Sequence, residues 1–209
     1  AKLSKRHGAL GVEAYRDMGI LPAALRNYLL RLGWSHGDEE IIDTAQAIAW
    51  FDLEGVGKSA ARFDIPRLES LNSHYIRTMD EAELCKLLAA QLCQGQAREL
   101  SAVEAARLSL ALDALKERAK TLIELADKAG FLLDGRPLAL EEKAAKLLEG
   151  EAPAILARAH ACLGVVEDWN LEPLTEAIRG LAEAEDLKLG KLAQPLRAAL
   201  TGRNGSPGI

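Results

Sequence analysis

The sequence predicts an all-α fold, and three observations lead to that prediction. Hydrophobic residues make up 49% of the 209 residues, which excludes a disordered chain and allows one large or two small cores. Aromatic residues make up only 4%, so the core has to consist mainly of leucine and alanine, which favours packed helices. Apolar residues recur at helical spacing, whereas no four-residue stretch shows the β-branched alternation of a strand. The lack of a fixed-period repeat disfavours a helical solenoid.

The first expected elements are a polar helical turn and a longer helix. The turn covers residues 13–18. Pro22 opens the helix, because its missing N–H costs nothing in the first turn, and Gly33 ends it. Arg26 and Arg31 are expected on the exposed side of this helix.

A loop, a third helix and a second loop follow. Residues 34–38 predict a loop in which His36 is solvated rather than a metal ligand, because no second ligand lies nearby. Residues 41–51 predict a helix with one apolar face. Residues 52–60 predict a loop, where Lys58-Ser59 could touch a phosphate or simply be exposed. The expected apolar face consists of Ile41, Ala45, Ile48 and Phe51.

Further helix starts are marked by N-capping residues. Asp64 begins a helix over residues 65–74, with Pro66 in its first turn. Three later pairs place a glutamate three positions after the cap, which is the spacing of a capping box. The third pair interrupts an otherwise continuous pattern, so we expect one helix to stop near Leu115 and the next to begin at Leu122. The pairs are Asp80 with Glu83, Ser101 with Glu104 and Thr121 with Glu124.

The joint between these two helices is basic, because Lys116, Arg118 and Lys120 follow one another within a short turn. From spacing alone, an exposed Lys/Arg-rich helix face is the alternative interpretation. Beyond this joint, residues 134–137 are the clearest linker signal in the chain. Further helices are predicted over residues 140–148, 153–163, 171–184 and 192–200, with Asn170 as a cap and Gly202 as a stop.

Charge and cysteine content limit the function. The net charge of −5 argues against binding nucleic acid by bulk attraction, although a local basic patch can still supply phosphate contacts. Cys85, Cys93 and Cys162 include no CxxC pair, so we expect reduced thiols, no disulfide framework and no metal site. Because no apolar run reaches the length of a membrane span and no signal peptide opens the chain, we expect a cytoplasmic protein without membrane contact.

The first residues form the most informative stretch. Lys2, Ser4, Lys5 and Arg6 precede a glycine and predict a surface loop. Such a loop can close over a polyphosphate, because lysine supplies point charge and backbone donors near glycine approach closely. A basic, solvated loop without a ligand is the alternative interpretation.

The segment KLSKRHGA, followed by EAYRDMGILPAALRNYLLRLGWSHGDE, resembles the KMSKR loop and the following region of class I aminoacyl-tRNA synthetases. The glutamyl-tRNA synthetases are the closest likeness, which continues through FDLEGVGKSAARFDIPRLESLNSHYIR and KLGKLAQPLRAALTG. Nothing resembles the nucleotide-binding sheet or the HIGH motif of that family. We therefore expect the C-terminal, tRNA-binding half of such an enzyme, with its own C-terminus truncated.

The resemblance implies roles for the first loop. Lys5 would bind ATP phosphates and stabilise the adenylation transition state, while Lys2, Ser4 and Arg6 would shape the closing loop. The whole enzyme would use ATP and Mg²⁺ to join L-glutamate to tRNA(Glu) through a glutamyl-adenylate. Glutamate and ATP would bind only through the catalytic domain, so this chain alone is expected to hold no cofactor and form no adenylate.

The resemblance also implies two places that read the anticodon. Arg118 would contact the third anticodon base, which favours a discriminating enzyme, although tRNA(Gln) stays open as a second partner. Arg197 would approach the middle base, with Ser206 and Pro207 shaping the pocket around it. Lys116 and Lys120 would make nonspecific phosphate contacts or be solvated. An arginine fork suits a base edge because it can donate two hydrogen bonds.

The resemblance divides the chain into three parts and implies a monomer. Residues 1–78 would hold the loop and a helical stem-contact subdomain along the inner side of the tRNA. Residues 79–134 and 135–209 would form two helical anticodon-binding subdomains. The side chains expected near the RNA in the first part are Asn72, His74, Tyr75 and Arg77.

Three alternatives stay open. A bacterial glutaminyl-tRNA synthetase reads the anticodon with β-barrels, and alternating strands are missing after residue 80. A truncated paralogue that modifies a tRNA base would lack the helical anticodon domain. A helical protein-interaction module without an RNA role would suit the Leu/Ala-rich helices but would not explain KLSKR or the two localised arginines.

Overall fold

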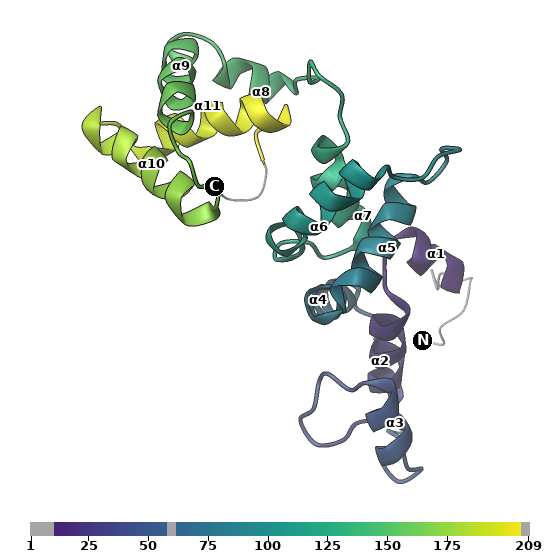
Figure 1. Cartoon of the computed structure of the whole chain (residues 1–209). Helices are drawn as coiled ribbons and strands as arrows, with labels where there is room; N and C mark the ends of the chain where they lie inside the picture. The colour runs from purple at the N-terminus through teal and green to yellow at the C-terminus, as the bar shows by residue number, and fades with distance from the viewer. Residues whose placement is uncertain (1–10, 58–61, 206–209) are drawn as a thin grey trace. The chain divides into compact units, whose positions relative to one another are not determined.

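The computed structural model describes residues 11–57 and 62–205. These residues form helices without any strand, and Trp34 and Val56 meet in an isolated antiparallel bridge. The all-α prediction is therefore confirmed. The chain divides into two compact units, Ala1–Gly130 and Phe131–Ile209 (Figure 1). The division falls just before the predicted linker, and the further division near residue 78 stays a prediction.

The helices of the first unit agree with most of the predicted segments. They are α1 Val12–Asp17, α2 Pro22–Gly33, α3 Thr44–Trp50, α4 Ile65–Thr78, α5 Glu81–Leu92, α6 Ala102–Lys116 and α7 Leu122–Ala129. The second unit opens with the end of a short 3₁₀ turn, η2 Gly130–Leu132. Its helices are α8 Glu142–Leu147, α9 Ala152–Leu163, α10 Leu171–Ala184 and α11 Leu189–Thr201. Among the described residues, no helix is both long and apolar enough to cross a membrane.

N-capping residues begin the helices of the first unit where the sequence predicts. The Ser101 side chain accepts from the Glu104 N–H and the Glu104 carboxylate accepts from the Ser101 N–H, which completes a capping box. Thr121 accepts from the Glu124 N–H at 3.1 Å, so α7 begins at the predicted break. These caps satisfy backbone N–H groups that have no partner inside the helix.

We expect acid to weaken the α6 cap. The hydrogen bond from the Ser101 backbone, with those from its hydroxyl and from Arg98, lowers the pKa of Glu104 to about 2. Because the folded-state pKa lies below the unfolded value, the cap contributes stability above about pH 4.5 and loses it as the pH falls toward 2. Melting temperatures between pH 5 and 2 should fall less steeply for Glu104→Gln than for the parent chain. Equal slopes would contradict this assignment.

The predicted helix over residues 41–51 is shorter than expected, and its expected apolar face is wrong. The helix begins at Thr44, and Ile48 is 78% exposed. Ile42 is buried instead, and its N–H donates to the Asn27 side chain at 3.0 Å. Asp43 then caps α3 in a box with Gln46. A contact from α2 therefore overrides the local apolar pattern.

The expectation that Asn72 faces RNA is also wrong. Asn72 is fully buried at the centre of the first unit, where its oxygen accepts from the Leu21 N–H at 2.7 Å. Its amide nitrogen donates to the carbonyls of Gly19 at 3.2 Å and Lys120 at 2.7 Å. The Leu122 N–H donates to the same Gly19 carbonyl. This side chain joins α4 to the α1–α2 turn and to the start of α7.

The second unit is held by a small aliphatic core. It lies where α9, α10 and α11 meet, and α8 packs on α11. Asn170 occupies the N-cap position of α10 without a side-chain capping bond, and its amide nitrogen donates to Asp168. Gly202 ends α11 as predicted, and the structure places it in the left-handed conformation. The core consists of Ile155, Ala159, Ile178, Leu192 and Leu196.

The three cysteines are free thiols. Burial, together with the charge of Glu81, raises the pKa of the Cys85 thiol. A raised pKa suppresses the reactive thiolate, which is consistent with a packing role for this residue.

Candidate nucleic-acid interface

Six residues that the sequence assigns to the site lie outside the described residues. These are Lys2, Ser4, Lys5 and Arg6 of the first loop, and Ser206 and Pro207 near the C-terminus. Their predicted roles stay predictions. The described candidates are Lys116, Arg118, Lys120 and Arg197.

The structure separates the three basic residues around the joint. Lys116 is only 12% exposed, and its ammonium group forms ion pairs with Asp113 and with Glu81. A hydrogen bond with Asp113 raises the pKa of Lys116 despite opposing desolvation. Arg118 and Lys120 are exposed. Lys116 thus fastens α6 to the start of α5, whereas the other two side chains are accessible to a ligand.

The α6–α7 joint (residues 117–121) presents Arg118 from a constrained backbone. The Arg118 carbonyl accepts a hydrogen bond from the Lys128 ammonium, and the buried Ala119 follows it. Within the described residues, no hydrogen bond or ion pair restrains the Arg118 guanidinium. A fixed backbone with a free planar fork is suited to two parallel hydrogen bonds with a base edge.

Arg197 lies in a pocket of about 280 Å³ between α10 and α11. Its Nε atom is buried and has no hydrogen-bond partner in the structure. Arg179 and Gln194 line the same pocket and were not identified from the sequence. A buried donor without a partner is costly, so an acceptor from a ligand would relieve that cost. The pocket can therefore offer a hydrogen-bonding edge to a planar group.

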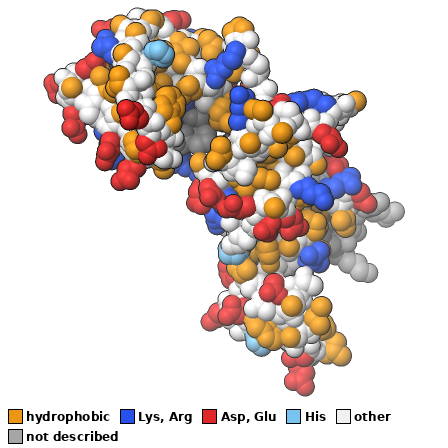
Figure 2. All heavy atoms as spheres, in the orientation of Figure 1, with side chains coloured by type: hydrophobic (Ala, Val, Ile, Leu, Met, Phe, Trp, Pro, Cys, Tyr) orange, Lys and Arg blue, Asp and Glu red, His pale blue; other side chains and the backbone are white. Residues whose placement is uncertain are grey.

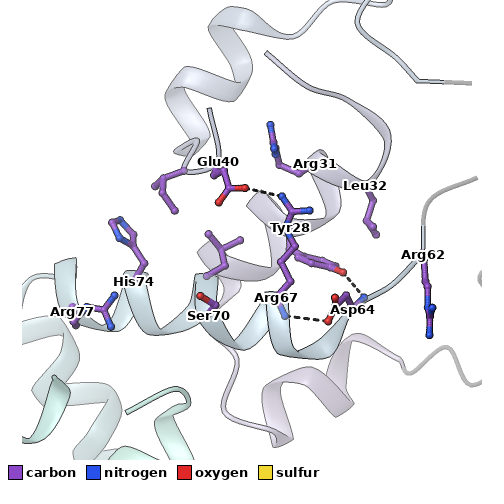
Figure 3. A pocket seen from close by; sticks show the side chains of 12 residues that line it. Tyr28, Arg31, Leu32, Glu40, Arg62, Asp64, Arg67, Ser70, His74 and Arg77 are labelled. Carbon is purple, nitrogen blue, oxygen red and sulfur yellow. Dashed lines mark hydrogen bonds and ion pairs between the residues drawn. The ribbon is translucent and has the colours of Figure 1, made fainter. Parts of the chain in front are cut away.

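A second hollow lies between α2 and α4 and is lined by basic side chains (Figure 3). Its volume is about 410 Å³. We call it the arginine groove, because its basic residues are Arg31, Arg62, Arg67, Arg77 and His74. Arg31 comes from α2, whereas Arg67, His74 and Arg77 lie along α4.

The acids of the groove are already engaged with protein groups. Glu40 forms an ion pair with Arg67 at 3.0 Å. Asp64 caps α4 by accepting from the Arg67 N–H at 3.3 Å. Arg31 carries a buried Nη1 atom that has no hydrogen-bond partner. The groove consequently keeps unpaired positive charge and a buried donor, which together favour an anion.

The groove was not predicted as a site, because it forms only when α2 and α4 pack together. Arg31 was expected on an exposed helix side and Arg77 near RNA, but nothing in their spacing joins them. The net charge of the chain does not reveal the groove either. On the visible face of each unit, Lys and Arg side chains lie interspersed with acidic ones (Figure 2). The described residues contain no cluster of three His, Cys, Asp or Glu side chains able to hold a metal ion.

Two families of known proteins match parts of this chain. The family described as "Anticodon binding domain" matches residues 82–209, which is more than half of the chain. The chain belongs to the anticodon-binding domain family. Residues 1–70 match a second family, the catalytic domain of class I tRNA synthetases (E and Q). In this anticodon-binding chain, Arg118 and Arg197 both lie within the matched domain.

Curated proteins similar to this chain include glutamate–tRNA ligases. The chain is 58% identical over its whole length to glutamate–tRNA ligase 2 of Brucella ovis and 56% identical to glutamate–tRNA ligase 1 of Brucella melitensis. It spans 45% of the length of each relative.

Solved structures of two glutamate–tRNA ligases are similar to this anticodon-binding chain. The enzyme of Elizabethkingia meningosepticum, solved with its amino acid, gives a TM-score of 0.80 at 28% identity. That of Elizabethkingia anophelis gives 0.74 at 29% identity. Each match covers the whole of this chain and 44% of the solved one.

Proposed function

We propose that this chain is the tRNA-binding and anticodon-reading part of a glutamate–tRNA ligase. The observation that carries the proposal is the identity of more than half of the residues with glutamate–tRNA ligases over the whole chain. The exposed Arg118 and the pocket-lining Arg197, both in the matched domain, give the proposal a physical basis. An anticodon loop offers unstacked bases, which are the RNA feature that proteins read most readily.

In this proposal the whole enzyme joins L-glutamate to tRNA(Glu) in the cytoplasm, using ATP and Mg²⁺ through a glutamyl-adenylate. Lys5 binds ATP phosphates, and Lys2, Ser4 and Arg6 shape the loop around them. The sequence KLSKR supports these assignments. We further propose a monomer with tRNA(Glu) as the main partner and tRNA(Gln) as a second substrate to be tested.

Arg118 reads the third anticodon base in this proposal. Its exposed guanidinium, which is unpaired within the described residues, supports this role, because both edges of the fork are available. Arg197 reads the middle base from its pocket, with Ser206 and Pro207 completing the surroundings. The buried Nε atom without a partner supports a ligand at that position.

The arginine groove binds phosphates of the tRNA body in this proposal. Arg31 supplies the buried donor, while His74 and Arg77 line the groove from α4. Charge-assisted bonds from guanidinium to phosphate are strong and insensitive to base sequence. Lys120 is exposed and makes a further phosphate contact, whereas the ion pairs of Lys116 favour a structural role.

One binding experiment tests the three sites together. The affinity of the chain for a glutamate-accepting tRNA transcript is measured beside transcripts changed at the third or middle anticodon base, across a stated salt series. Arg118→Ala should lose about 1–3 kcal/mol of third-base discrimination while keeping middle-base discrimination. Arg197→Ala should show the converse. Arg31→Ala should weaken all transcripts equally and reduce the salt slope by about 1.

Arg107→Ala is the matched control, since Arg107 is an exposed arginine of α6 outside the groove and the joint. It should leave discrimination between the transcripts unchanged. Binding that is indifferent to both anticodon changes would remove base reading from the proposal and leave a tRNA-body binder. No binding to any transcript would favour the helical protein-interaction module.

A further inference from the structure

The backbone that carries Arg118 is held from one side by two adjacent residues of α4. The Ser73 hydroxyl donates to the Ala119 carbonyl at 2.9 Å. The Asn72 amide donates to the Lys120 carbonyl at 2.7 Å. The two carbonyls that follow Arg118 in the chain are therefore both fixed by side chains distant in sequence.

The Ser73 hydroxyl is the donor in its hydrogen bond with Ala119, and a neighbouring arginine favours that orientation. Arg77, one helical turn later, donates from Nη1 to the Ser73 oxygen at 2.6 Å. A hydroxyl has one hydrogen to donate, and the guanidinium cannot accept it. With the arginine on the oxygen, the hydroxyl hydrogen is free to point at the Ala119 carbonyl. Arg77 therefore orients the bond that Ser73 makes with the joint.

Burial makes this chain of bonds effective. Ser73 is 8% exposed and Ala119 is fully buried, so water cannot readily replace the bond between them. A buried carbonyl without a donor costs more than the bond itself contributes, and the backbone would move to find another partner. Arg118 is the residue immediately before that carbonyl. A side chain that must align a planar fork with a base edge is sensitive to such movement.

We propose that Ser73 is a positioning residue for Arg118 and that Arg77 orients its hydroxyl. The inference rests on the proposed function, because it assigns Ser73 a role in anticodon reading rather than in RNA contact. The predicted signature is a loss of third-base discrimination without a change in the number of phosphate contacts. A residue needed only for folding would not produce that signature.

The first test compares Ser73→Ala with Thr78→Ala in the whole 209-residue chain. Thr78 is the matched control, because its hydroxyl also donates to a backbone carbonyl of α4, that of His74, at 3.0 Å. The readout is the ratio of affinities for the parent transcript and the third-base variant. Ser73→Ala should lower this ratio about two- to tenfold, the range expected for one neutral hydrogen bond, with an unchanged salt slope. Thr78→Ala should leave the ratio unchanged, and Ser73→Thr should retain most of it.

The second test combines Ser73→Ala with Arg118→Ala in one protein. If Ser73 acts through Arg118, Ser73→Ala should have no further effect on the ratio there, as a double-mutant cycle would show. Arg77→Met gives an independent variant at an exposed position, should Ser73→Ala fail to fold. It should also lower the third-base ratio, in addition to any general loss of affinity.

The outcomes separate the two proposals. If Arg118→Ala leaves the ratio unchanged, the assignment of Arg118 as a base reader fails, whatever Ser73 does. If Arg118→Ala lowers the ratio and neither Ser73→Ala nor Arg77→Met does, the positioning role is overturned. An equal effect of Ser73→Ala with and without Arg118 would overturn it as well, because the residue would then act elsewhere.

Discussion

Replacing Asn72 by leucine is expected to lower the free energy of unfolding of the first unit by about 3–5 kcal/mol. Leucine has a similar size but cannot hydrogen-bond. The change would leave the Leu21 N–H and the carbonyls of Gly19 and Lys120 without this partner. Each buried polar group left unpaired costs about 1–3 kcal/mol. The sum is moderated because the Gly19 carbonyl also accepts from Leu122.

Urea unfolding followed by tryptophan fluorescence measures this loss. Trp34 is buried in the first unit, whereas Trp169 of the second unit is 67% exposed, so the signal reports mainly on the first unit. Gln94→Leu is the matched control in the same unit, because Gln94 also carries an amide but is exposed, and its side-chain oxygen accepts from Gln91 at 2.8 Å. The control should change stability by less than about 0.5 kcal/mol. Equal midpoints for the two variants would refute the structural role of Asn72.

Replacing Gly202 by alanine is expected to destabilise the second unit by about 2–4 kcal/mol. Gly202 has φ +71°, a conformation that costs a residue with a Cβ about 1–2 kcal/mol. The added Cβ would also overlap the carbonyl oxygen of Ala139. Relief would require movement of a backbone that bonds to Ala198 and Glu141, and such overpacking costs about 1–3 kcal/mol more.

Gly180→Ala provides a control of opposite sign. Gly180 lies inside α10, where a new Cβ would meet nothing within 4 Å. Alanine should stabilise that helix by up to about 1 kcal/mol, because glycine has a poor helix propensity. Thermal unfolding followed by circular dichroism at 222 nm compares the two variants. A Gly202→Ala protein that melts with or above the parent chain would contradict the predicted clash.

Helix boundaries could be predicted wherever a short-range rule decides them. Pro22 and Gly33 mark the ends of α2, and Ser101 with Glu104 begins α6, because capping and chain-breaking act within a single turn. The break before Leu122 was predictable for the same reason. Arg118 could be placed in the joint because a cap beginning a new helix leaves the preceding residues in a turn.

Contacts between distant segments decided which residues are buried where the sequence prediction was wrong. The expected apolar face of α3 is largely exposed, and Ile42, which precedes the helix, is buried in its place. Asn27 of α2 accepts a hydrogen bond from the Ile42 backbone. Asn72 became a buried hub because three backbone groups from other segments meet it.

The sequence by itself determined the all-α class, most helix ends and the two arginines proposed to read bases, since these follow from local spacing or from family motifs. Only the tertiary structure decided that Lys116 is ion-paired, that the arginine groove exists and that Ser73 contacts the joint. These features depend on which helix faces pack together, and that choice is made by burial and hydrogen bonding summed over the whole unit rather than by any one segment.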